Sequence, residues 1–201
     1  MIDVSIVIAT YNAEATIERA IRSCLRQSML TDEFEVIVVD DGSTDGTREI
    51  IENFTETWLR VIHLPENVGV GGARNEGIKK ARGKFIVMVD SDDFISEYMI
   101  FIQRMYLEMN KGIAAVAVDY YEIDEEEDIL RRVNCLDAPI ACGVMYRKSK
   151  LIEVGLYKEL RLHEEKELFF RFLDKFPTYR IALPLYRYYM REGSLTHQEG
   201  E

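Results

Sequence analysis

The stretch Lys84–Asp93, KFIVMVDSDD, decides the fold that the sequence predicts. An apolar run this short and rich in Val and Ile is typical of a buried strand in a parallel sheet. We therefore expect a strand at Phe85–Val89. The polar residues that follow it at once are Asp90, Ser91, Asp92 and Asp93.

Three carboxylates at one strand end repel one another and raise each other's pKa. A divalent cation held by Asp90 and Asp92, Mn²⁺ or Mg²⁺, would relieve this repulsion. Magnesium-type ions take one or two protein carboxylates and fill the remaining positions with phosphate oxygens and water. The alternative is a polar turn that caps the next helix, with Ser91 or an Asp as N-cap. We favour the metal site because two other strand ends carry matching polar clusters.

Strands alternate with helices through the first half of the chain. The expected strands are Asp3–Ala9, Phe34–Val39, Leu59–Leu64 and Phe85–Val89. The expected helices are Ala13–Gln27, a second one capped by Asp45, and Ala73–Ala81, which Gly83 ends as a C′ glycine. This order predicts an α/β fold with a mostly parallel central sheet and helices on both faces.

In such sheets ligands bind outside the carboxyl ends of the strands. Three strand ends deliver polar residues to that edge: Thr10-Tyr11-Asn12, Asp40-Asp41 and Asp90-Ser91-Asp92. We therefore expect one binding site there.

The second half is less regular. We expect helices at Glu97–Asn110, Ser149–Val154 and Glu164–Lys175, and strands at Ile113–Tyr120, Pro139–Arg147, Tyr179–Leu183 and Leu185–Met190. The acidic run Glu122–Asp128 is typical of a solvated loop or hairpin tip.

Composition narrows the class of protein. The formal net charge of −11 and the lack of a basic stripe argue against a nucleic-acid surface. Three cysteines without metal-ligand spacing indicate free thiols in a reducing compartment. No signal peptide and no apolar run as long as a membrane span is present, so we expect a cytoplasmic protein, with peripheral membrane association left open.

Six motifs together resemble the family 2 glycosyltransferases: SIVIATYN, EVIVVDDGSTDGT, NVGVGGARNEG, GKFIVMVDSDD, HEEKELFFRF and SLT. They run from residue 3 to about residue 196 in the family's order. The resemblance implies an inverting enzyme with the GT-A, Rossmann-like nucleotide-sugar fold. It also implies a single domain over residues 1–201, with a nucleotide-binding half at about 1–93 and an acceptor-binding half at about 94–201.

The resemblance assigns the donor site residue by residue. Thr10, Tyr11 and Asn12 would line the nucleotide pocket, beside Ser91. Asp41 would accept a hydrogen bond from the base, with Asp40 beside it, and Arg74 would reach the base or the diphosphate. Asp90 and Asp92 match the family's D-x-D motif, with Asp92 the more direct metal ligand. The implied donor is a nucleotide-diphosphate sugar, expected to be a UDP-sugar.

Glu165 resembles the catalytic base, with Glu164 as its neighbour, although the family usually has Asp there. Arg191 stands where many members carry a metal-ligating His. An arginine cannot ligate a metal but can pair with the diphosphate directly, so metal dependence stays open, and His197 could substitute. No membrane helices of the kind that processive relatives carry follow the last motif, which favours transfer of a single sugar.

The sequence is compatible with two other classes of protein. One is a non-catalytic nucleotide-sugar-binding module of the same fold. The other is an Asp-based phosphoacceptor domain of the flavodoxin-like type, which fits poorly because it needs an acceptor Asp after the next strand and a later Lys.

Overall fold

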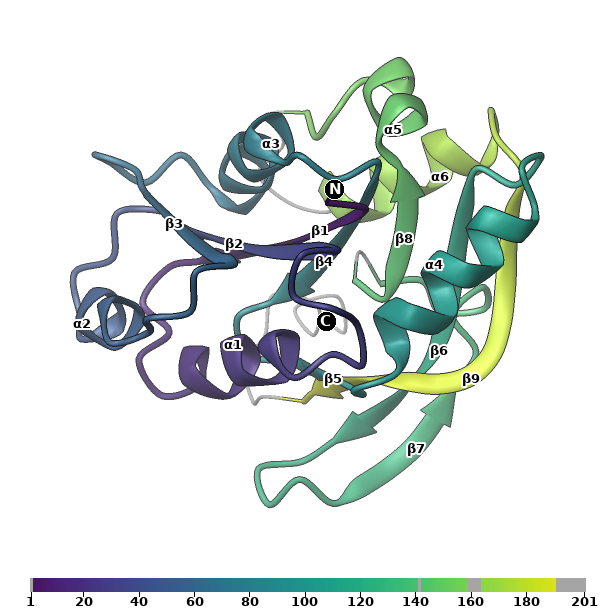
Figure 1. Cartoon of the computed structure of the whole chain (residues 1–201). Helices are drawn as coiled ribbons and strands as arrows, with labels where there is room; N and C mark the ends of the chain where they lie inside the picture. The colour runs from purple at the N-terminus through teal and green to yellow at the C-terminus, as the bar shows by residue number, and fades with distance from the viewer. Residues whose placement is uncertain (1, 141, 159–163, 191–201) are drawn as a thin grey trace.

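The computed structural model describes residues 2–140, 142–158 and 164–190, apart from the side chains of Glu164 and Glu165. The strands in these ranges form one sheet in the order β3-β2-β1-β4-β8-β6-β9-β5, and β7 pairs with β6 beside this path. Helices cover both faces of the sheet (Figure 1). The expected α/β architecture is confirmed.

The first half of the chain forms the parallel part of the sheet. Its strands are β1 (Val4–Thr10), β2 (Phe34–Asp40), β3 (Leu59–His63) and β4 (Phe85–Asp90), all parallel to one another. Its helices are α1 (Ile17–Leu25), α2 (Thr47–Glu52) and α3 (Val70–Lys80). In Figure 1, α3 lies on one face of β1 and β2, and α1 and α2 lie on the other.

Every residue of β1 and β2 is buried, as is all of β4 except its last residue. The side chains are mostly Val and Ile, each of which contributes about 1.5–3 kcal/mol when it leaves water completely. Burial on both faces explains why these strands are continuous apolar runs rather than alternating ones.

The second half extends the sheet with mixed directions. It contains β5 (Phe94–Ile95), α4 (Met99–Met109), β6 (Ala115–Ile123), β7 (Ile129–Val133), β8 (Val144–Arg147), α5 (Lys148–Val154), α6 (Glu164–Leu173) and β9 (Thr178–Tyr189). Strand β8 is antiparallel to both β4 and β6, whereas β9 runs parallel to β6. The carboxyl ends of β4, β6 and β9 therefore point the same way.

Residues 124–128 of the acidic run form the tip of the β6–β7 hairpin, as predicted, and this hairpin projects from the body of the molecule in Figure 1, whereas Glu122 lies in β6 and is buried. The prediction of two separate strands on either side of Pro184 is wrong, because β9 continues through this residue. Proline has no N–H to give to the ladder, and the register with β6 shifts at this point. The strand expected from Pro139 begins only at Val144, after Gly143 with φ of 75°.

The first helix begins four residues later than predicted. The backbone N–H of Ala13 donates to Thr47 Oγ1 at 2.7 Å, and that of Glu14 donates to Asp45 Oδ2 at 3.3 Å. Thr47 at the start of α2 and Asp45 just before it thus bind the backbone of residues 13 and 14, and α1 begins after this turn. Asp45 also accepts a hydrogen bond from the N–H of Thr47 at 3.0 Å, but the N-cap of α2 is Gly46, so the prediction that Asp45 caps this helix is wrong.

Gly83 was predicted as a C′ glycine, but α3 ends at Lys80 and Gly83 has no positive φ. A Cβ at this position would lie 2.6 Å from the backbone nitrogen of Ser5. Close approach of two backbones, rather than helix termination, therefore requires glycine here.

Among the described residues, no helix has both the length and the apolarity needed to cross a membrane.

Candidate active site

The three polar clusters meet at one edge of the sheet. Thr10 pairs in register with Asp40 on one side, and Ala9 pairs with Asp90 on the other. Neighbouring strands lie about 4.8 Å apart, so the ends of β1, β2 and β4 form one surface. The convergence predicted from the sequence is therefore present in the structure.

The two aspartates after β2 make different contacts. Asp40 is fully buried and accepts hydrogen bonds from Ser43 N at 2.9 Å and Arg48 Nε at 3.2 Å, while His63 Nδ1 lies 2.9 Å away. Burial alone would raise the pKa of Asp40, but the hydrogen bonds from Ser43, His63 and Arg48 lower it below its ordinary value. These contacts are those of a residue that orients the loop.

Asp41 instead faces the Gly-rich loop before α3. It is buried, and its Oδ1 accepts a hydrogen bond from the N–H of Val68 at 2.8 Å. Burial raises the pKa of Asp41, and the charge of Asp40 adds to this effect, although hydrogen bonds from Val68 and Gly69 oppose it. The carboxylate is thus held in place at the sheet edge.

The cluster after β1 contains one exposed and one buried candidate. Tyr11 is 48% exposed, whereas Thr10 is buried. Among the described residues, the Oγ1 of Thr10 has no hydrogen-bond partner. Asn12 has φ of 48°, and its Oδ1 accepts a hydrogen bond from Thr44 N at 2.8 Å. The buried hydroxyl of Thr10 is therefore suited to a ligand group, and Asn12 to shaping the loop.

Arg74 lies in the first turns of α3 and is only 3% exposed. Its Nη2 donates to Asp90 Oδ1 at 2.5 Å, and its guanidinium carbon lies 5.3 Å from the centre of the Tyr157 ring. Part of the positive charge that the acidic cluster requires thus comes from the chain itself. Arg74 thus lies at the sheet edge beside Asp90, and its expected contact with a base or a diphosphate stays a prediction.

The third aspartate of the run has a structural role that sequence reasoning missed. Asp93 is buried, accepts a hydrogen bond from the Tyr186 hydroxyl at 2.6 Å and accepts another from the N–H of Tyr189 at 2.8 Å. The Tyr186 hydroxyl in turn accepts from the N–H of Asp90 at 3.2 Å. Burial raises the pKa of Asp93 well above its ordinary value, and the charges of Asp92 and Asp90 add to this. Asp93 therefore fastens the acidic turn to β9.

The acidic turn fits a particular kind of metal site. Within the described ranges, no three His, Cys, Asp or Glu side chains gather so that they could hold an ion by themselves. Asp90 and Asp92, flanking the half-buried Ser91, provide hard oxygen ligands. They fit a cation that takes one or two carboxylates and completes its shell with phosphate oxygens and water.

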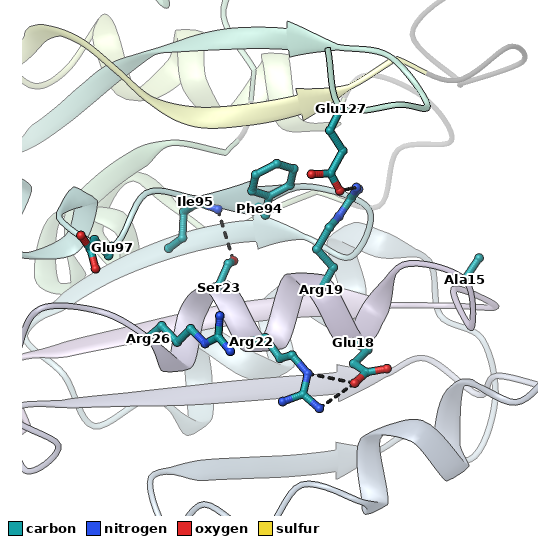
Figure 2. A pocket seen from close by; sticks show the side chains of 10 residues that line it. All are labelled: Ala15, Glu18, Arg19, Arg22, Ser23, Arg26, Phe94, Ile95, Glu97 and Glu127. Carbon is teal, nitrogen blue, oxygen red and sulfur yellow. Dashed lines mark hydrogen bonds and ion pairs between the residues drawn. The ribbon is translucent and has the colours of Figure 1, made fainter. Parts of the chain in front are cut away.

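Arg19 of α1 holds this turn from the other side, and nothing in the sequence marks it. Its Nη2 donates to the backbone carbonyl of Asp92 at 2.7 Å, and its Nη1 pairs with Glu127 of the β6–β7 tip at 2.7 Å. Figure 2 shows Arg19 reaching Glu127 beside the ring of Phe94, which lies 4.8 Å from the guanidinium carbon. These groups line a cavity of about 570 Å³ between α1 and the hairpin.

Helix α6 carries Glu164 and Glu165 at its start, but their side chains lie outside the described structure, as do Arg191, His197 and the S-L-T motif. Arg171 attaches the helix to the rest of the protein. Its guanidinium donates to the carbonyls of Val154, Gly155 and Leu156 after α5, and to Glu167 one turn earlier.

The acidic edge lies at the carboxyl ends of the parallel strands, which is where α/β sheets bind their ligands. The sequence model of the family described as "Glycosyl transferase family 2" matches residues 5–180. The chain belongs to this family.

Relatives agree with this assignment. The succinoglycan biosynthesis protein ExoO of Rhizobium meliloti (strain 1021) is 41% identical over 121 residues, which are 60% of this chain and 34% of that protein. The S. aureus protein TarS is named a poly(ribitol-phosphate) β-N-acetylglucosaminyltransferase. Its crystal structure (residues 1–349) with UDP-GlcNAc has a TM-score of 0.82 and 25% identity, over 98% of this chain and 61% of that chain.

A third likeness concerns the fold alone. The mannosyltransferase PcManGT from Pyrobaculum calidifontis, in complex with GDP-Man and Mn²⁺, has a TM-score of 0.78 at 18% identity, over 96% of this chain and 58% of that chain. The expected GT-A fold is confirmed. This chain spans less than two thirds of the length of ExoO and of both solved chains.

Proposed function

We propose that this chain transfers one sugar from a UDP-sugar to an acceptor hydroxyl with inversion, in the synthesis of a cell-surface polysaccharide. The observation that carries this proposal is the convergence of Asp41, Arg74 and the Asp90–Asp92 turn at one sheet edge. The UDP-GlcNAc bound to TarS supports a UDP-sugar as the donor. The name of ExoO, a succinoglycan biosynthesis protein, supports a role in polysaccharide synthesis.

The donor would lie across the ends of β1, β2 and β4. Asp41 would accept a hydrogen bond from the imide N–H of uracil, because its carboxylate is already held at the edge by Val68. Thr10, Tyr11 and Asn12 would line the nucleoside side of the same pocket. Ser91, Arg74 and Arg191 would lie toward the diphosphate, where a positive charge opposes the charge of the leaving group.

Asp92 would be the principal ligand of a divalent cation, Mn²⁺ or Mg²⁺, with Asp90 beside it. When bound, such an ion neutralises charge on the diphosphate. The chain's own contribution is to hold the turn rigid, through Arg19 at the Asp92 carbonyl and through Asp93 at Tyr186. Arg74 shares the charge of Asp90 and so limits how fully Asp90 can coordinate.

Glu165, next to Glu164 in the half of the chain at about 94–201, would remove the proton from the acceptor hydroxyl. A single in-line attack inverts the anomeric carbon, so one base suffices. The cytoplasmic location stays a prediction, and peripheral membrane association stays open.

Glu165→Gln tests the proposal, with UDP-GlcNAc as donor and water as acceptor. We expect slow UDP release by the wild-type protein and a loss of about 10²–10⁴-fold in the variant, because glutamine cannot accept the proton. Thermal stabilisation by UDP-GlcNAc should be unchanged. Glu153→Gln, on α5, is the control.

If Glu165→Gln releases UDP at the wild-type rate, Glu165 is not the catalytic base. Donor binding by the wild-type protein without any UDP release would favour the non-catalytic binding module instead.

A further inference from the structure

A second cavity, of about 450 Å³, lies in the other half of the molecule. Its walls come from β6, β7, β9, α6 and the loop before β8. The lining residues used below are Tyr120, Glu122, Arg131, Lys166, Phe170 and Tyr188. A cavity of this size holds a small organic ligand of one or a few rings.

This cavity lies beside the proposed catalytic groups. Tyr188 is two residues beyond Tyr186, whose hydroxyl contacts both the Asp93 carboxylate and the Asp90 N–H. Lys166, which also lines the cavity, directly follows Glu165 in α6. The cavity thus shares β9 with the contacts of the acidic turn and shares α6 with the proposed base, as a site for an acceptor would.

Aromatic rings from three different elements line the cavity. The rings of Tyr120 and Tyr188 meet edge to face, with their centres 5.8 Å apart. Phe170 presents a ring that is 52% exposed. Aromatic faces combined with a few polar groups suit a ligand with an apolar ring face and hydroxyl groups around it, as in a pyranose.

The charged groups of the cavity compensate one another. Glu122 accepts two hydrogen bonds from Arg131, at 2.5 and 2.7 Å. Asp137 accepts a hydrogen bond from Asn134 at 2.7 Å, and Lys166 brings a second positive charge. The lining therefore has two carboxylates and two cations. A phosphate in this site would compete with Glu122 for Arg131, whereas hydroxyl groups can bind the pair without breaking it.

We propose that this cavity binds a neutral sugar residue of the acceptor, with one ring face against Phe170. The proposal rests on the proposed function, because it assigns the acceptor side of the same reaction. The proposed acceptor is neutral. It therefore differs from the polymer in the name of TarS, poly(ribitol-phosphate), which carries phosphate in every unit.

Saturation-transfer NMR on the full chain tests this inference. The probes are the methyl glycosides of glucose, galactose, mannose and N-acetylglucosamine, with ribitol 5-phosphate as the anionic alternative. We expect at least one neutral glycoside to bind, and Phe170→Ala to weaken its binding by about fivefold to tenfold through the lost aromatic contact. Phe101→Ala is the matched control, because Phe101 is a 41% exposed ring on α4, outside this cavity.

UDP-GlcNAc in the same samples separates the two claims. If UDP-GlcNAc binds but no neutral glycoside does, or if only ribitol 5-phosphate binds, the acceptor inference is wrong and the proposed function stands. Glycoside binding that Phe170→Ala leaves unchanged would also overturn it. If neither UDP-GlcNAc nor UDP itself binds, the proposed function fails, because every UDP-sugar contains UDP.

Discussion

Arg74 connects stability and function at the level of a single side chain. It is buried at the start of α3, yet its charge is directed toward an acidic turn 16 residues later. The chain itself thus holds the acidic turn through this contact, and a turn held in place reduces the ordering that binding a donor or a cation requires.

We predict that Arg74→Met destabilises the protein by about 2 kcal/mol, because it leaves Asp90 without its partner while roughly preserving volume. Losing one partner of a fully buried pair costs about 3–5 kcal/mol, but Asp90 is 29% exposed and keeps some contact with water. Urea unfolding measures the change. Wild-type stability in Arg74→Met would show that the pair does not hold the turn.

Asp119, in β6, makes the stability of the protein depend on pH. Its carboxylate is fully buried, with Arg180 donating two hydrogen bonds at 2.7 Å and Arg132 one at 2.8 Å. Burial would raise the pKa of Asp119, but the hydrogen bonds from Arg180 and Arg132 lower it to about 2. The ionised form is thus favoured in the folded state.

Because this pKa is lowered on folding, its contribution to stability is complete above about pH 4 and is lost as the pH falls toward 2. The difference amounts to about 2 kcal/mol. Asp119→Asn should therefore lose less stability than the wild-type protein between pH 4 and pH 2, as measured by urea unfolding at each pH. Equal slopes for the two proteins would contradict this assignment.

At the scale of elements, the placement of α6 depends on Arg171. Its guanidinium contacts three successive carbonyls after α5, as well as Glu167 within the helix. Hydrogen bonding to Arg171, together with Lys158, lowers the pKa of Glu167 to about 2, so this pair remains ionised at neutral pH. The helix that carries the proposed base is therefore attached by a network at its far end.

We predict that Arg171→Met lowers UDP release from UDP-GlcNAc by up to about 10²-fold, because a displacement of about 1 Å at the base is enough for such a loss. Nucleotide binding, measured by thermal shift, should not change, since the donor edge lies on β1, β2 and β4. Arg26→Met, at the exposed C-cap position of α1, is the control. Equal loss of nucleotide binding would indicate general unfolding instead.

At the scale of the whole molecule, the first half could be predicted because local pattern and topology agree there. Buried parallel strands are continuous apolar runs, and the direction of parallel strands places their polar ends at one edge. The positions of Asp41 and of the Asp90–Asp92 turn follow directly. The helix boundaries were less accurate because they depend on contacts between distant residues, such as the hydrogen bond from the N–H of Ala13 to Thr47 at the start of α2.

The second half depends on pairings between distant segments. Strand β5 has two residues and exists because it pairs with β9, about 90 residues later. Nothing local distinguishes such a strand. Pro184 indicated a break, but a shift of register accommodates it within β9.

The site shows the same division. Carboxylates at strand ends can be found from the sequence by their spacing. Arg19 could not be found in this way, because it acts through the backbone carbonyl of Asp92, a residue 73 positions away. One feature of the sequence could have indicated the structural role of Asp93. It is the third carboxylate of the run, which a metal site with two carboxylate ligands does not need. The roles of Glu165 and Arg191 stay predictions, because those side chains lie outside the described structure.

The central claim is that the edge formed by β1, β2 and β4 binds a nucleotide diphosphate with help from Asp92. Calorimetric titration of UDP into wild-type and Asp92→Asn protein, each with and without Mn²⁺, tests it most directly. We predict that Mn²⁺ strengthens UDP binding to the wild-type protein by at least about tenfold, or about 1.4 kcal/mol, and that Asp92→Asn removes this gain while keeping the metal-independent binding. An undiminished manganese effect in Asp92→Asn, or no UDP binding to the wild-type protein, would contradict the account.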